Sequence, residues 1–206
     1  MTTPVTVSLH AAPAAGYDQP FEMLGACHER VQRMLALLRR LRLHVEAHGA
    51  DPQARQAARD VMRYFDVAAP AHHEDEERHV FPPLLAAGVC VAEVHRLRDE
   101  HREMAATWPA VRAVLVALAE GRSSRFGLRD LAQLDDFERL YDWHLAAENE
   151  LVFPAARRHT DAETQRAMGW EMAGRRAGQL PGRKSTRLNC SHGSTSYGVF
   201  SSNKKA

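Results

Sequence analysis

Residues 72–82 read HHEDEERHVFP, and residues 144–154 repeat the pattern as HLAAENELVFP. Both copies contain a histidine, a glutamate four positions later and a Phe-Pro pair that starts five positions after the glutamate. On a helix, side chains four positions apart share a face, with about 5–6 Å between their Cβ atoms. An imidazole and a carboxylate arranged in this way can bind one metal ion. The repetition therefore predicts a site for two metals.

The first copy contains two overlapping pairs with this spacing, His72 with Glu76 and His73 with Glu77. Since adjacent residues on a helix point in different directions, only one pair can face the metal. Alignment of the copies on Phe-Pro places His72 and Glu76 opposite the pair in the second copy. The ligands that the repeat predicts are therefore His72, Glu76, His144 and Glu148. His73 and Glu77 become flanking residues that could contact the ligands.

Helical periodicity dominates the chain between residues 21 and 180, and strand signals are missing. We expect one helix on each side of Gly49, with Asp51 and Pro52 starting the second, and two further long helices after Gly88. Prolines should kink the second helix just before His72 and disturb its end after residue 81. Short turns between helices of this length predict an all-α, up-down-up-down four-helix bundle, followed by a short C-terminal fifth helix.

Two further histidines, His28 and His101, occupy equivalent positions in the first and third predicted helices. Each has apolar residues four positions before it and three and seven positions after it, so each lies on the apolar stripe. Burying a histidine or glutamate costs several kcal/mol unless the group is paired or bound to metal. The chain thus consists of two similar helical hairpins, whose packing would bring four imidazoles and two carboxylates together. Such a mixture of ligands favours iron or manganese over zinc.

The order of these elements, with the Phe-Pro endings, resembles that of the hemerythrin-like (HHE cation-binding) family over about residues 20–157. The resemblance implies a four-helix bundle that holds two non-haem iron ions with an oxo or hydroxo bridge. The ligands that it implies are His28 and His72 for one iron, His101 and His144 for the other, and Glu76 and Glu148 as bridges.

The same resemblance bears on function. Oxygen carriers of the family add one histidine four positions before the third-helix ligand, where this chain has Leu97. The set of six ligands is instead similar to that of bacterial members linked to nitric oxide response and iron–sulfur cluster repair. It implies a protein that binds or reacts with O2, NO or peroxide in sensing, storage or stress defence. The alternative is a redox enzyme of iron–sulfur cluster repair or peroxide removal.

Composition narrows the possible partners and location. The 206 residues carry a net charge of +1, which gives no electrostatic case for binding nucleic acid or an acidic membrane. The apolar runs are too short to span a bilayer, and the first twenty residues do not resemble a signal peptide. The three cysteines form neither a CxxC pair nor a disulfide framework. We therefore expect a cytoplasmic protein.

Both ends of the chain differ in composition from the predicted bundle, which we place at residues 21–180. Residues 1–20 contain prolines and small residues and are expected to form a flexible arm. Residues 181–206 contain all three lysines of the chain and show no helical period, so we expect them to be unstructured. The run KSTRLN at residues 184–189 resembles translated adaptor sequence, which makes this tail either a sequence artefact or a native disordered segment.

Overall fold

The computed structural model describes residue 16 and residues 18–178, and this part of the chain is helical without strands. The predicted all-α fold is therefore confirmed. The expected arm at residues 1–20 and the expected tail at residues 181–206 lie outside the described residues, apart from residue 16 and residues 18–20.

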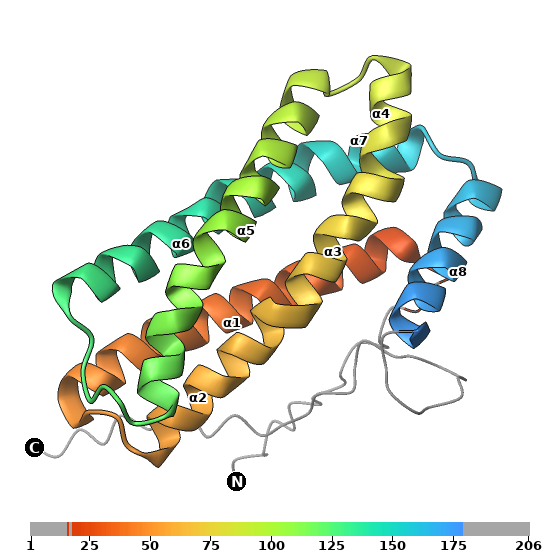
Figure 1. The fold of residues 1–206 in the computed structure, drawn as a ribbon. Coiled ribbons are helices and arrows are strands. Elements are labelled where there is room, and N and C mark those ends of the chain that lie inside the picture. Colours follow the sequence, from red (N-terminus) through yellow and green to blue (C-terminus); the bar gives the residue numbers. More distant parts are fainter. Residues whose placement is uncertain (1–15, 17, 179–206) are drawn as a thin grey trace, which may run out of the picture.

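Four long helical rods form an up-down-up-down bundle, and a fifth helix packs at one end (Figure 1). The first and third rods are single helices, α1 (Pro20–His48) and α5 (Val91–Ala119). The second rod consists of α2 (Pro52–Arg63), η1 (Tyr64–Ala68), α3 (Ala69–Asp75), η2 (Glu76–Val80) and α4 (Phe81–Ala87). The fourth rod consists of α6 (Leu128–Ala147), η3 (Glu148–Val152) and α7 (Phe153–Arg158), and α8 (Ala162–Gly178) follows it.

Local sequence signals explain where the rods begin and end. Gly49 ends α1 with a φ of 73°, a conformation that glycine adopts without steric cost. The side chain of Asp51 then caps α2 by accepting a hydrogen bond of 2.7 Å from the backbone N–H of Ala54. Asp161 caps α8 in the same way, accepting from the N–H of Thr164 at 2.7 Å. The predicted start of α2 at Asp51 and Pro52 is confirmed.

The prolines inside the second and fourth rods are accommodated by π-helical turns rather than by breaks. Proline lacks the backbone N–H, and its ring crowds the carbonyl four residues earlier. The wider turns η1, η2 and η3 lie just before Pro70, Pro82 and Pro154, and the second rod continues to Ala87. The expected disturbance after residue 81 is therefore a widened turn that precedes the proline. Turns η2 and η3 begin at the two predicted carboxylate ligands, and π-helical turns are frequent at functional sites.

The apolar core has two parts, and the lone histidines separate them. On α1, Leu24 belongs to one part and Val31 to the other, with His28 between them. On α5, Leu97 and Met104 flank His101 in the same way. Each fully buried leucine or methionine contributes about 1.5–3 kcal/mol. The two apolar layers thus hold the polar middle of the bundle in place from both sides.

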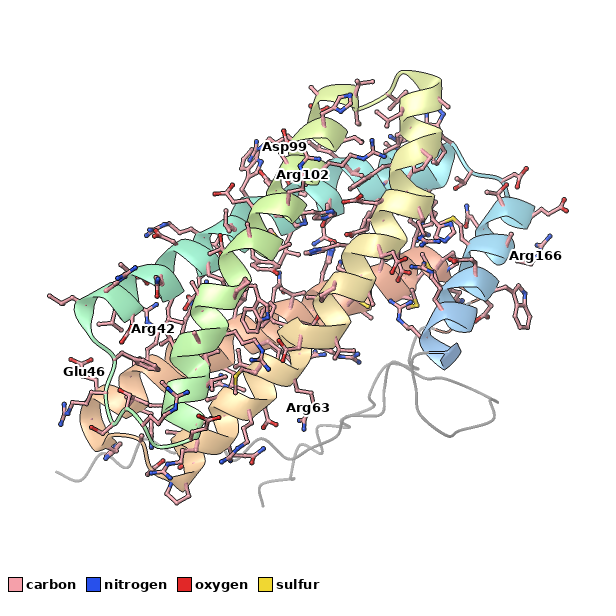
Figure 2. The ribbon with its side chains drawn as sticks, in the orientation of Figure 1. Arg42, Glu46, Arg63, Asp99, Arg102 and Arg166 are labelled. Carbon is pink, nitrogen blue, oxygen red and sulfur yellow. The ribbon has the colours of Figure 1, made fainter. Side chains whose placement is uncertain are left out.

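Charged residues cover the outside of the bundle, where Figure 2 shows Arg63, Asp99 and Arg102. Helix α8 is attached to this surface by its buried Met168 and Met172 and by two arginines, Arg175 and Arg176, which form ion pairs with buried Asp75 on α3. Over residues 16 and 18–178, none of the helices has the length and apolar character that crossing a bilayer requires.

Candidate metal centre

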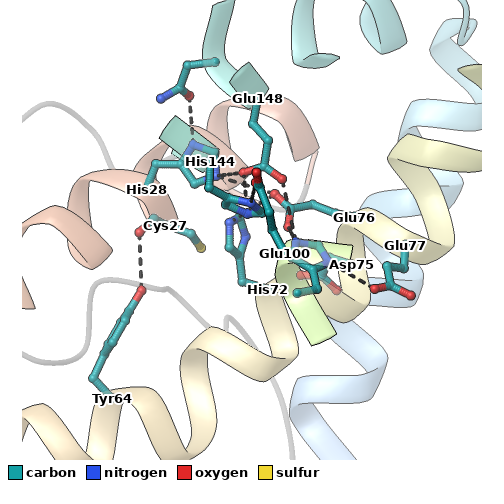
Figure 3. Close-up of polar contacts among 12 residues, drawn as sticks. Cys27, His28, Tyr64, His72, Asp75, Glu76, Glu77, Glu100, His144 and Glu148 are labelled. Atoms are coloured by element: carbon teal, nitrogen blue, oxygen red, sulfur yellow. Dashed lines mark hydrogen bonds and ion pairs between the residues drawn. The ribbon is translucent and has the colours of Figure 1, made fainter. Parts of the chain in front are cut away.

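The structure brings together all six residues that the sequence predicts as ligands. Figure 3 labels five of them, which are His28, His72, Glu76, His144 and Glu148. The six residues come from all four rods, and none is more than 4% exposed. Their contributions are His28 from α1, His72 and Glu76 from the second rod, His101 from α5, and His144 and Glu148 from the fourth rod.

Both carboxylates lie between the two histidine pairs. Oε1 of Glu76 is 3.5 Å from Nε2 of His28 and 3.1 Å from Nε2 of His72, whereas its Oε2 is 3.5 Å from Nε2 of His101. Oε2 of Glu148 is 3.1 Å from Nε2 of His28 and 3.3 Å from Nε2 of His144. The other oxygen of Glu148 is 3.8 Å from Nε2 of His101.

These contacts define two four-residue groups that share the carboxylates. We call them position A, formed by His28, His72, Glu76 and Glu148, and position B, formed by His101, His144, Glu76 and Glu148. Within each group, one potential ligand atom from every residue lies within 4.8 Å of the others. Each position therefore offers two imidazoles and two carboxylate oxygens to one cation.

The inward-facing atoms have no hydrogen-bond partners. Nε2 of every histidine in the two positions is buried and unpartnered, and so are both oxygens of Glu76 and of Glu148. Leaving one buried polar group unsatisfied costs about 1–3 kcal/mol, and more if the group is charged. Nitrogen and oxygen atoms that converge in this way are typical ligands of iron and related metals. The donor set thus fits a pair of bound cations.

The pKa values show how strongly the cluster attracts positive charge. Burial opposes protonation of His28, but the adjacent carboxylates of Glu148 and Glu76 outweigh burial and raise the pKa of this imidazole to about 10. Burial lowers the pKa of His72 to about 3, so this imidazole stays neutral. Burial and the neighbouring Glu76 raise the pKa of Glu148. In the absence of metal, a proton on His28 therefore compensates part of the carboxylate charge.

Metal affinity is expected to rise with pH between pH 6 and 8. Because the pKa of metal-free His28 lies near 10, its proton must leave before Nε2 can bind a cation at position A. Release of one proton strengthens binding by about tenfold per pH unit. Competition with a chelator of known proton affinity would measure this slope, and pH-independent binding would contradict the prediction.

Three of the four imidazoles donate hydrogen bonds from their outer nitrogen. Nδ1 of His28 donates to Oδ1 of Asn149 at 2.8 Å, and Nδ1 of His101 donates to Oε1 of Glu77 at 3.0 Å. Nδ1 of His144 donates to Oε2 of Glu100 at 3.0 Å. Such bonds fix the tautomer that leaves Nε2 free to bind metal, and they fix the orientation of the ring.

The phenylalanines of the two Phe-Pro pairs hold the lone histidines. Phe153 stacks on His28 with 4.9 Å between ring centroids and 19° between planes. Phe81 stacks on His101 at 5.7 Å and 24°. Each phenylalanine therefore packs on the histidine from the other hairpin, which gives the repeated Phe-Pro pair a structural role beside the metal centre.

Sequence reasoning named Glu77 and His73 as flanking residues that could contact the ligands, but it missed Asn149 and Glu100. Asn149 and Glu77 hold equivalent positions in the repeat, directly after the predicted carboxylate ligands, so the repeat contained a signal for both. Glu100 had no such signal. His73, considered only as a flanking residue, stacks on His101 with centroids 4.0 Å apart and planes at 10°.

A cavity of about 540 Å³ reaches the centre between α3 and α5. His73 and His101 lie in its lining, together with aromatic side chains such as Trp108 and Tyr141 and charged ones such as Glu77. Pockets of this volume are typical of small-molecule sites. This cavity gives small molecules a route to the His101 side of position B.

Fold and site together define a four-helix-bundle protein with a buried histidine and carboxylate cluster. Residues 19–156 match the family model of the hemerythrin HHE cation-binding domain, and the chain therefore belongs to this family. It is also 31% identical over 163 residues to an uncharacterized protein of Haemophilus influenzae, a match that covers 79% of this chain and 92% of that protein.

Proposed function

We propose that the protein holds two non-haem iron ions, joined by an oxo or hydroxo bridge, that bind or react with O2, NO or peroxide. The observation that carries this proposal is the set of buried, unpartnered Nε2 and carboxylate atoms that divides into positions A and B. When bound, an iron pair supplies open coordination positions and a change of oxidation state. The physiological setting would be sensing, storage or stress defence.

The residues of the chain have distinct parts in this proposal. His28 and His72 would hold the metal at position A, and His101 and His144 would hold the metal at position B. Glu76 and Glu148 would be shared by both metals, since each carboxylate lies close to histidines of both positions. The outer hydrogen bonds and the stacked phenylalanines keep the imidazoles aimed inward.

The cavity beside His101 indicates that the molecule that reaches the metal pair is small. His101, which lines this cavity, is only 4% exposed, so only a small group can reach the metal pair past it. Leu97 lies on the turn before His101, is 1% exposed and offers no ligand atom. Position B therefore has as many protein ligands as position A, which leaves room for solvent or a small ligand.

Metal analysis with an optical spectrum tests the proposal directly. Purified protein should contain about two irons per chain, because each position offers a complete set of protein ligands. The oxidised protein should absorb in the near ultraviolet as an oxo-bridged ferric pair does, and the reduced protein should bind NO. Purification with zinc or without metal, or binding of no more than one iron after reconstitution with excess iron, would contradict the proposal.

In air, the reduced protein is expected to become ferric within seconds to minutes, without reversible oxygenation. Because Leu97 leaves position B without a further imidazole, each iron should keep an open coordination position, and two open positions favour oxidation over release of oxygen. Stopped-flow absorption spectroscopy measures the rate. The Leu97→His variant provides the matched comparison and should oxidise more slowly. A colour change in air that vacuum fully reverses would contradict the prediction.

A further inference from the structure

The two hairpins are similar, yet they differ at the positions that face the outer nitrogens of the histidines. The residue after the bridging carboxylate is Glu77 in the first hairpin and Asn149 in the second. The residue before the lone histidine is Cys27 in the first hairpin and Glu100 in the second. At both places, one hairpin has a carboxylate and the other has none.

The two carboxylates at these places, Glu77 and Glu100, both accept hydrogen bonds from histidines of position B. Glu77 accepts from His101 at 3.0 Å, and Glu100 accepts from His144 at 3.0 Å. Glu100 also receives a hydrogen bond of 2.7 Å from Nε of Arg96 through its other oxygen. Each imidazole of position B is therefore backed by a carboxylate.

Position A lacks this support. His28 donates to the neutral amide oxygen of Asn149 at 2.8 Å. Nδ1 of His72 is buried and has no hydrogen-bond partner. Cys27 holds the place that Glu100 has in the other hairpin, and its carbonyl oxygen accepts from the hydroxyl of Tyr64 at 3.4 Å. Neither imidazole of position A is backed by a carboxylate.

This difference in hydrogen-bond partners affects metal binding, because the group that accepts from Nδ1 controls how strongly Nε2 of the same imidazole binds a metal. A carboxylate that accepts from Nδ1 raises the basicity of the ring and holds its orientation, whereas a neutral amide does so less. Loss of such a partner typically lowers metal affinity by about 10–100-fold. The bridging carboxylates are common to both positions, so they do not cancel this inequality.

We infer that the two metal positions are unequal: position B binds its metal first and holds it, whereas position A binds last and exchanges. This inference rests on the proposed di-iron function. The cavity strengthens the division, because it opens beside His101 of position B. A small ligand therefore approaches the firmly held metal, while the metal at position A can leave or be replaced.

A matched pair of histidine variants tests which position can hold metal alone. His72 and His144 occupy the same place in the two repeats, and both are 1% exposed. After reconstitution and gel filtration, His72→Ala should retain about one iron per chain, because the supported position B is intact. His144→Ala should retain almost none. Circular dichroism of the metal-free variants verifies that both are folded.

Two isosteric variants test whether the hydrogen-bond partners of the outer nitrogens cause the inequality, and neither variant removes a metal ligand. Chelation of the reduced protein should release half of the iron in a fast phase and half in a slow phase. Glu77→Gln should accelerate the slow phase by about 10–100-fold, and Asn149→Asp should slow the fast phase. Glu103→Gln, an exposed change on the same helix as Glu100, is the control and should alter neither phase.

The outcomes separate this inference from the function on which it rests. A protein with two irons that leave in one phase, or equal iron retention by the two histidine variants, would overturn the inference and leave the di-iron proposal intact. Acceleration of the fast phase by Glu77→Gln would overturn it as well. A protein that binds no iron would contradict both.

Discussion

Replacing Glu148 by alanine is expected to remove both metals from the chain, and Glu76→Ala should have the same effect. Each carboxylate lies between positions A and B, with oxygens near the histidines of both. Its loss therefore takes a ligand from each metal and removes a bridge. Iron content should fall from about two per chain to nearly zero, because the one remaining carboxylate would have to bridge two adjacent cations and offset the charge of both. Metal analysis after gel filtration measures this change.

The control for this prediction lies in the same turn. Glu150 is exposed and outside the cluster, so Glu150→Ala should keep its iron. Metal-free Glu148→Gln should unfold at the same or a higher temperature than the metal-free parent, because burial already raises the pKa of this carboxyl group. Retention of half of the iron by Glu148→Ala would show that this carboxylate is not a bridge.

Removing both arginines that attach α8 should cost the fold about 3–5 kcal/mol, the range found when a buried ion pair loses one partner. Asp75 is 1% exposed, and Arg175 and Arg176 both pair with it. Burial raises the pKa of Asp75 even with both arginines present. The double variant Arg175→Ala, Arg176→Ala leaves this carboxylate buried without a counter-charge. Denaturant unfolding measures the loss of free energy.

An exposed pair provides the comparison for the arginine variant. Arg102 and Asp99 form an ion pair on α5 in which both side chains are mostly exposed, so Arg102→Ala should cost less than about 1 kcal/mol. Adding Asp75→Asn to the double arginine variant should recover much of the lost stability, since it removes the unpaired charge. Equal costs for the double variant and for Arg102→Ala would contradict the prediction.

Attachment of α8 also concerns the metal centre. Asp75 directly precedes Glu76, with which turn η2 begins. The arginines of α8 therefore fix the backbone next to a carboxylate that faces both metal positions. A helix that sequence analysis considered only as a short appendage thus supports the site from outside the bundle.

Much of the fold follows from the sequence because the signals are local. The period of apolar residues, the cap at Asp51 and the glycine at position 49 each act within a few residues of the chain. The repeat also decides between the two overlapping pairs, because only one register places His72 opposite His144. The geometry then brings these residues together with His28 and His101, since four amphipathic helices can bury their apolar stripes only by facing one another.

The sequence by itself thus determined the helical bundle, its two-hairpin repeat and the six residues that meet inside it. Only the tertiary structure decided which residues stand behind the imidazoles. Asn149 meets His28 across 121 positions of sequence, and Glu100 meets His144 across 44. Contacts of this kind depend on the rotation and offset of one packed helix against another, which no local periodicity specifies. The inequality of positions A and B arises from those contacts, because each carboxylate or amide acts on a histidine of a different rod.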